Sequence, residues 1–182
     1  MSVDAVTLLF ALLALACQIA VLTAVVLVVA GRFNPAAARK RRELVDLVSG
    51  DALALAALVA GVATAGSLYL SEGAGFPPCR LCWVQRGFMY PLAVILAVAA
   101  WRRARRVALF AAVAAAAGGS VSIYHMVLER YPSLESSASC DPDNPCSLIW
   151  VEHFGYMTIP TMALSGFAMI VVLTLAARAG SD

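Results

Sequence analysis

Charged residues are scarce in this 182-residue chain. Aspartate, glutamate, lysine and arginine together make up 13% of it, whereas an ordinary soluble domain carries about 25%. No acidic or basic tail is present, and nothing in the sequence is typical of nucleic-acid binding. Hydrophobic residues instead account for 62%, and the mean hydropathy is +0.86. Most of the chain is therefore expected to face lipid or other membrane helices.

The chain also lacks a basic segment ahead of its first apolar run, where Asp4 is the one charged residue. A cleaved signal peptide would need such a segment, so this run is expected to be a spanning helix. A spanning helix requires roughly 20 apolar residues. Five stretches meet this requirement: 6–30, 47–70, 81–101, 107–128 and 157–177. The sequence thus predicts an all-α membrane protein with five spanning helices and no soluble domain.

Basic residues are concentrated in two of the connections between these stretches. Because basic connections remain in the cytoplasm, this distribution predicts an outer N-terminus and a cytoplasmic C-terminus. The other connections carry mainly acidic residues and are expected on the outer face. The basic residues are Arg32, Arg39, Lys40, Arg41 and Arg42 after the first stretch, Arg102, Arg103, Arg105 and Arg106 after the third, and Arg178 after the fifth.

The chain has five cysteines. Cys17 lies alone in the first apolar stretch, near the middle of the bilayer by residue count, and a packing role is expected for it. The other four form two local pairs, Cys79/Cys82 and Cys140/Cys146. The predicted topology places both pairs at the outer surface, where disulfides persist.

The first pair is a Cys-x-x-Cys motif preceded by Pro77 and Pro78. The two prolines are expected to place Cys79 and Cys82 in the first turn of a helix, where a thiolate is stabilised. Such a pair is typical of reactive dithiols. A static disulfide is an open alternative. A zinc half-site is disfavoured because the motif has no neighbouring ligands in sequence, and Trp83 stands where haem attachment requires histidine.

Two polar residues follow on the same helix. Arg86 comes four residues after Cys82 and shares its face, and Gln85 lies beside it. Arg86 could stabilise a thiolate or the negative charge on a bound acceptor. The alternative is an arginine that extends to the lipid headgroups.

The second pair lies in the long connection 129–156, where prolines, aspartates and an asparagine between Cys140 and Cys146 indicate tight turns. A small, exposed ring of this kind favours thiol exchange over a structural role, although a structural bridge remains an alternative. Ile149, Trp150 and Phe154 indicate a segment lying on the membrane surface. Two pairs on one face suggest a relay in which an external dithiol reduces the loop pair, the loop pair reduces the Cys-x-x-Cys, and an apolar acceptor in the bilayer takes the electrons.

Over residues 47–177 the sequence resembles the DsbB/BdbC family of bacterial thiol:quinone oxidoreductases. The short second pair is more similar to the BdbC type. The resemblance rests on an ordered set of motifs: Pro78-Cys79-Arg80-Leu81-Cys82, Gln85-Arg86, Tyr124-His125, Tyr131-Pro132-Ser133, Cys140-Asp141, Pro145-Cys146, Phe154-Gly155 and Ile159-Pro160.

This resemblance implies a four-helix bundle in the bacterial plasma membrane that reoxidises an extracytoplasmic, thioredoxin-fold oxidase of the DsbA type. The electrons would pass to ubiquinone or menaquinone. Cys82 would contact the quinone with Cys79 as its partner. Cys140 would exchange with the partner protein, and Cys146 would then attack Cys79.

The resemblance also implies a quinone site. Arg86 would stabilise the thiolate and the quinone oxygen, and Gln85 would lie in the same site. His125 would lie close to the quinone headgroup, its alternative being an interfacial histidine without a catalytic role. No metal site is expected.

Residues 1–46 have no counterpart in the family, which has four spanning helices. They are expected to form an additional spanning helix and a basic cytoplasmic loop, ahead of the catalytic bundle in 47–182. Other functions remain open: a vitamin K epoxide reductase-like protein, whose loop pair would precede the Cys-x-x-Cys, a reductive thiol transporter, or a non-catalytic scaffold with two structural disulfides.

Overall fold

The structure is a computed structural model that describes residues 2–135 and 144–180. Within these residues, five helical segments are long and apolar enough to span a membrane. This confirms the prediction of an all-α membrane protein with five spanning helices. The segments are α1 (Val3–Ala30), α3 (Ala52–Leu68) with the π-helical turn Tyr69–Gly73, α4 (Arg80–Trp101), α5 (Ala108–Arg130) with the preceding 3₁₀ turn Arg105–Val107, and α6 (Ile159–Ala179).

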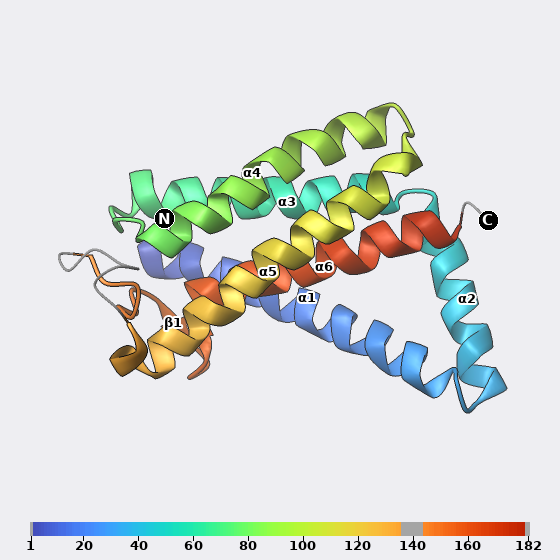
Figure 1. The fold of residues 1–182 in the computed structure, drawn as a ribbon, viewed down its shortest axis with the longest axis horizontal. Helices are drawn as coiled ribbons and strands as arrows, with labels where there is room; N and C mark the ends of the chain where they lie inside the picture. Colours follow the sequence, from blue (N-terminus) through green and yellow to red (C-terminus); the bar gives the residue numbers. More distant parts are fainter. Residues whose placement is uncertain (1, 136–143, 181–182) are drawn as a thin grey trace.

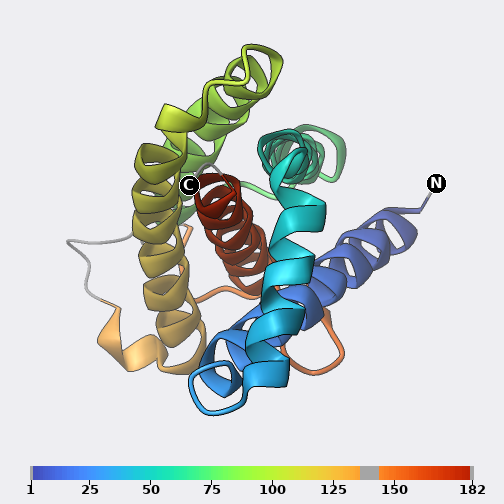
Figure 2. The ribbon, with the colours of Figure 1, turned by 90° about the vertical axis from the view of Figure 1, so that its right-hand side faces the viewer.

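The helices α3, α4, α5 and α6 form a bundle in which α6 lies between α3 and α5 (Figures 1 and 2). Alanines of α3 and α5, such as Ala56 and Ala111, are fully buried in its core. Larger side chains of α4 and α6, such as Leu96 and Phe167, fill the space between them. Small residues let helix backbones approach closely in lipid, where no hydrophobic force drives helices together.

The N-terminal helix α1 packs on the outside of this bundle, mainly against α6, which it crosses at an angle (Figure 1). Hydrogen bonds of polar side chains join α1 to α6 and to the connection that precedes α6. Gln18 donates a hydrogen bond to the Ser165 hydroxyl (3.0 Å) and accepts one from the Tyr156 hydroxyl (3.0 Å). A further contact joins His153 Nε2 to the Thr7 hydroxyl at 3.1 Å.

A helix, α2 (Pro35–Ser49), occupies the segment that was expected to be a basic loop. Asn34 caps it by accepting a hydrogen bond from the Ala36 N–H (2.9 Å), and Pro35 is compatible with its first turn. The alanines and long charged residues that follow are good helix formers. The basic connection expected here therefore contains a helix that the sequence analysis did not identify. The second spanning helix begins at Ala52 instead of residue 47, because α2 and Gly50 take up the intervening residues.

The connection between α5 and α6 begins with the 3₁₀ turn Pro132–Leu134 and ends in a short antiparallel hairpin, β1 (Glu152–His153) and β2 (Met157–Thr158). Phe154 and Gly155 form its turn with positive φ angles of 56° and 73°.

The three apolar residues Leu148, Ile149 and Trp150, which shortly precede this hairpin, are exposed. The side chain of Trp150 is 41% exposed, and its ring stacks on that of Phe76 with centroids 5.4 Å apart. The loop is thus anchored beside the segment that leads into α4.

Gly118 of α5 lies where this helix packs closely against α6. A Cβ atom there would come within 2.5 Å of the ring of Phe167, which is 1% exposed. We expect Gly118→Ala to lower the free energy of unfolding by about 1–3 kcal/mol, because the ring must shift inside a packed core. Gly61→Ala is the matched control, since its Cβ would have no neighbour within 4 Å, and it is expected to be neutral or stabilising. Thermal unfolding in detergent, followed by circular dichroism, compares the two. Equal Tm values for both variants would contradict this account of the packing.

Candidate functional site

The Cys-x-x-Cys motif begins α4, as the two prolines before it predict. Cys79 is the N-cap residue, and its sulfur accepts a hydrogen bond from the Cys82 backbone N–H (3.4 Å). The Cys79 and Cys82 sulfurs lie 3.1 Å apart, and both residues are free thiols. Because the motif lies at the N-terminus of a helix, the helix dipole favours negative charge on Cys79.

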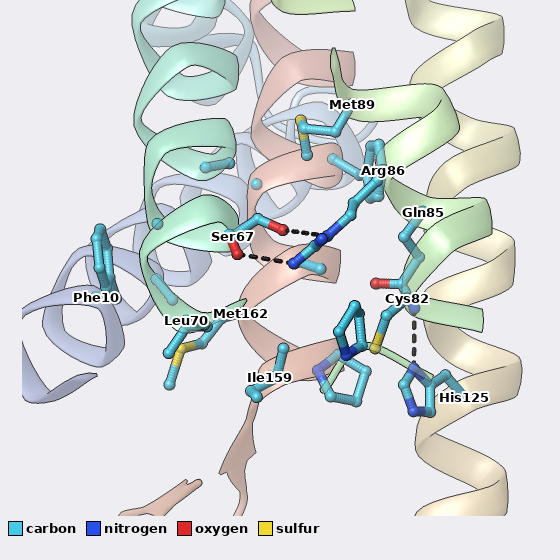
Figure 3. Close-up of a pocket in the computed structure, with 18 of the residues that line it drawn as sticks. Phe10, Ser67, Leu70, Cys82, Gln85, Arg86, Met89, His125, Ile159 and Met162 are labelled. Atoms are coloured by element: carbon cyan, nitrogen blue, oxygen red, sulfur yellow. Dashed lines mark hydrogen bonds between the residues drawn. The ribbon is translucent and has the colours of Figure 1, made fainter. Parts of the chain in front are cut away.

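His125 of α5 connects the motif to the loop between α5 and α6. Its Nε2 lies 3.7 Å from the Cys79 sulfur and 3.0 Å from the Cys146 carbonyl oxygen. Its Nδ1 lies 3.0 Å from the amide nitrogen of Gln85 (Figure 3). The amide N–H donates to Nδ1, so the proton of a neutral imidazole is on Nε2 and points toward Cys146 and Cys79.

The Cys79 thiol is strongly acidified. Its pKa is lowered from the ordinary 9.0 to about 4, chiefly by the hydrogen bond from the Cys82 thiol. Burial opposes this shift, while the hydrogen bond and charge of His125 and the Cys82 backbone N–H reinforce it. The negative charge of the reduced pair therefore rests on Cys79 at neutral pH, and Cys82 keeps the shared proton.

Arg86 is buried and does not extend to the lipid headgroups. Its Nε donates to the Ser67 hydroxyl (2.9 Å) and its Nη2 to the Ser67 carbonyl oxygen (2.8 Å), as Figure 3 shows. The guanidinium also lies 5.0 Å from the centroid of the Trp83 ring. Among the described residues it forms no salt bridge. A buried arginine without a carboxylate provides a positive charge for an anionic or partly anionic ligand.

These residues surround a cavity of about 430 Å³. Its walls are mainly apolar side chains of α1, α3, α4 and α6, and Cys17 of α1 lies on one wall. Cys79 and Cys82 open onto it at the end nearest the loop between α5 and α6. The polar residues that line it are Ser67, Gln85, Arg86, Tyr90, His125 and Glu129.

The second pair is described only at Cys146, because Cys140 lies outside the described residues. Cys146 is disulfide-bonded and 1% exposed, and it packs against Cys79 and Leu128. The Glu135 carboxylate accepts hydrogen bonds from the backbone N–H groups of Cys146 and Ser147. These contacts fix the described part of the loop with Cys146 beside the free Cys79.

Three polar residues of this region were not identified from the sequence as site residues. Ser67 is one of several small residues in α3, and nothing marked it as the partner of Arg86. Glu129 lies four residues after His125 on α5 and accepts a hydrogen bond from the Thr158 hydroxyl (2.6 Å). The spacing of four residues from His125 is the one feature of the sequence that could have predicted that Glu129 lies at the site. Glu135 lies too far from Cys146 in sequence to be paired with it.

Cys79, Cys82 and His125 could also be ligands of a metal, since their ligand atoms lie within 4.8 Å of one another. The two sulfurs are 3.1 Å apart, whereas two thiolates on a tetrahedral zinc would be about 3.8 Å apart. The Nε2 that faces Cys79 also faces the Cys146 carbonyl oxygen. In this state the two thiols are hydrogen-bonded to each other, and His125 lies beside Cys79.

A membrane bundle with a Cys-x-x-Cys at a helix N-terminus, packed against a disulfide-bonded loop cysteine, defines a membrane protein of disulfide chemistry. The sequence model of the family described as "Disulfide bond formation protein DsbB" matches residues 50–177. The chain belongs to this family, and its function is membrane disulfide formation.

The names of curated relatives agree with membership of this family. The chain is 39% identical over 115 residues to the "Disulfide bond formation protein C" of Bacillus subtilis, covering 63% of this chain and 83% of that protein. It is 39% identical over 111 residues to the "Probable disulfide formation protein C 1" of Bacillus anthracis, covering 61% and 80%. It is 40% identical over 115 residues to a "Probable disulfide formation protein" of Oceanobacillus iheyensis, covering 63% and 79%. No solved structure matches the chain significantly.

The acidified thiol gives a pH prediction. In the reduced protein the Cys79 thiolate is expected to persist from neutral pH down to about 4, because its pKa is lowered to that value. His125→Ala removes the hydrogen bond from Nε2 to the Cys79 sulfur, so the thiolate should become protonated at a higher pH in this variant. The ultraviolet absorbance of the thiolate, measured against pH with Cys79→Ser as the blank, tests both points. A wild-type transition near the ordinary pKa of 9.0 would contradict the assignment.

Proposed function

We propose that this protein reoxidises an extracytoplasmic, DsbA-type thiol oxidase and passes the electrons through two cysteine pairs to a membrane quinone. One observation carries the proposal. The free Cys79 packs against the disulfide-bonded Cys146 on one side and opens with Cys82 onto an apolar cavity with a buried arginine on the other.

The cavity has the chemistry that a quinone requires. Its volume of about 430 Å³ lies in the range of small-molecule sites, about 300–1,000 Å³. Apolar walls suit the tail and ring, while Arg86 can donate to a carbonyl oxygen of the ring. A bound quinone would supply an acceptor for two electrons and two protons.

The first step takes place in the outer loop. A thiolate of the reduced partner attacks Cys140, the bond to Cys146 breaks, and the sulfur of Cys146 leaves with the electron pair. The second thiol of the partner then displaces Cys140. The partner is left with a disulfide, and Cys140 and Cys146 hold two electrons and the protons.

The second step transfers these electrons to the Cys-x-x-Cys. In the oxidised motif, Cys146 attacks Cys79, the bond between Cys79 and Cys82 breaks, and Cys140 then displaces Cys79 to re-form the loop disulfide. The contact of Cys79 with Cys146 and the imidazole beside both residues support this route. The structure, with free Cys79 and Cys82 and a bonded Cys146, corresponds to the state that this step produces.

In the third step Cys79 and Cys82 lose two electrons and two protons into the cavity, and their disulfide re-forms. Arg86 orients the acceptor because Ser67 fixes its guanidinium. Glu129 and His125 line the same cavity and can accept or pass protons. In the proposed orientation this end of the bundle faces the outside, in a bacterial plasma membrane.

The first experiment separates the two halves of the relay. Cys82→Ser is expected to abolish steady-state reduction of a decyl-benzoquinone by a reduced DsbA-type partner. The Cys140/Cys146 pair should still accept electrons from the partner in a single turnover, because the loop disulfide is unchanged. Stopped-flow partner oxidation and quinone absorbance measure the two steps.

Cys146→Ser is the comparison for that experiment, since it should block both steps. Unchanged quinone reduction in Cys82→Ser would refute the relay. Loss of the single-turnover partner oxidation in Cys82→Ser would show that the two pairs do not act in the proposed order.

Arg86→Lys tests how the acceptor is held. Lysine keeps the positive charge but loses the forked contact with Ser67, so the charge is no longer oriented. We expect KM for the decyl-benzoquinone to rise about tenfold, equivalent to about 1.4 kcal/mol, with partner oxidation unchanged. Arg102→Lys, an exposed residue at the opposite end of α4, is the control. An Arg86→Lys enzyme with the KM of this control would exclude a direct role in acceptor binding.

A further inference from the structure

We propose that α1, which precedes the region matched by the DsbB family, forms part of the acceptor site and that Phe10, Leu13 and Cys17 contact the apolar part of the bound quinone. This inference rests on the proposed function. It assigns a role to the segment for which the family resemblance implied none.

The residues of α1 that line the cavity share one helix face. They follow the spacing i, i+3, i+4 and i+7, which places them in a continuous stripe. The residues are Phe10, Leu13, Ala14, Ala16 and Cys17, of which Ala16 lies at the edge of the stripe. Beyond them, Leu22 and Val26 are 63% and 61% exposed and face away from the bundle. Within α1, the residues that line the cavity all lie in the N-terminal half of the helix.

This face lies against the same structural elements that hold the polar end of the cavity. The ring of Phe10 lies so close to Gly66 of α3 that a Cβ atom there would approach it to 3.0 Å. The next residue, Ser67, is the one that fixes Arg86. Figure 3 shows Phe10 across α3 from Ser67 and Arg86, beyond Leu70. A quinone with its ring at Arg86 would have its apolar part directed to the wall that α1 provides.

The position of α1 is specified by directional contacts. Lipid exerts no hydrophobic force that would press an apolar helix onto a bundle. Gln18, one residue after Cys17, bonds to Ser165 of α6 and to Tyr156 of the hairpin connection. Ala11 is fully buried and packs in one cluster with Met157. These contacts hold the cavity-lining face of α1 at a fixed depth and rotation.

Leu13 lines the cavity and is 44% exposed, whereas Leu22 is 63% exposed and does not line it. Leu13→Trp enlarges a side chain at the cavity wall, and Leu22→Trp makes the same change away from the cavity. We expect Leu13→Trp to raise KM for a decyl-benzoquinone by about tenfold or more, because the larger side chain occupies space needed by the acceptor. Leu22→Trp should keep the wild-type KM. Single-turnover oxidation of the partner should be equal in both variants, which would show that both are folded. Equal KM values for the two variants would overturn the inference.

A binding measurement that needs no turnover completes the test. In Cys79→Ser/Cys82→Ser protein, the rate at which N-ethylmaleimide alkylates Cys17 is followed by mass spectrometry of its peptide. A decyl-benzoquinone with every ring carbon substituted should slow this reaction severalfold, whereas an aliphatic alcohol of the same chain length should not. Unaltered alkylation would refute contact with α1. Protection of Cys17 in the double variant, combined with wild-type protein that fails to reduce the quinone, would instead refute the proposed function and leave the binding site in place.

Discussion

The site depends on the imidazole of His125, which lies between Cys79 and the backbone of Cys146. One nitrogen lies near the Cys79 sulfur and the Cys146 carbonyl oxygen, and the other bonds to Gln85. The residues come from the start of α4, the C-terminal end of α5 and the loop before α6. The proposed exchange requires the loop pair to lie beside the Cys-x-x-Cys, and this contact holds Cys146 there. Glu135 completes the arrangement by fixing the backbone at Cys146.

A buried arginine is the second constraint. A guanidinium in the membrane interior is costly unless its donors are satisfied. Ser67 satisfies two of them, one through its hydroxyl and one through its backbone carbonyl. This serine directly precedes the end of α3, where the chain widens into the π-helical turn Tyr69–Gly73. Irregular turns of this kind occur frequently at functional sites, and here the turn lies next to the residue that orients Arg86 toward the cavity.

The spanning helices could be predicted because local composition alone determines them. The start of α4 could be predicted as well, since prolines act on their own neighbours. The helix α2 was missed because its many charged residues were interpreted as a loop, although Asn34 and Pro35 are a helix start signal. Helical spacing placed Gln85 and Arg86 beside the motif. It could not find their partners, because His125 and Ser67 meet them only through the packing of other helices.

The two cysteines of the motif have different surroundings, and this bears on their roles. The resemblance assigns the acceptor contact to Cys82, yet the acidified thiol is Cys79. The two assignments are compatible if they describe different steps of the proposed electron transfer. In the proposed relay, Cys79, which packs with Cys146, would carry the charge after the loop pair delivers its electrons, while Cys82 would retain the proton that the two sulfurs share across 3.1 Å. Cys82 and Arg86 are four residues apart on one face of α4 and line the same cavity. Movement of that proton to Cys79 would therefore place the thiolate on the sulfur that shares a helix face with the arginine, which is the direction the proposed electron transfer requires.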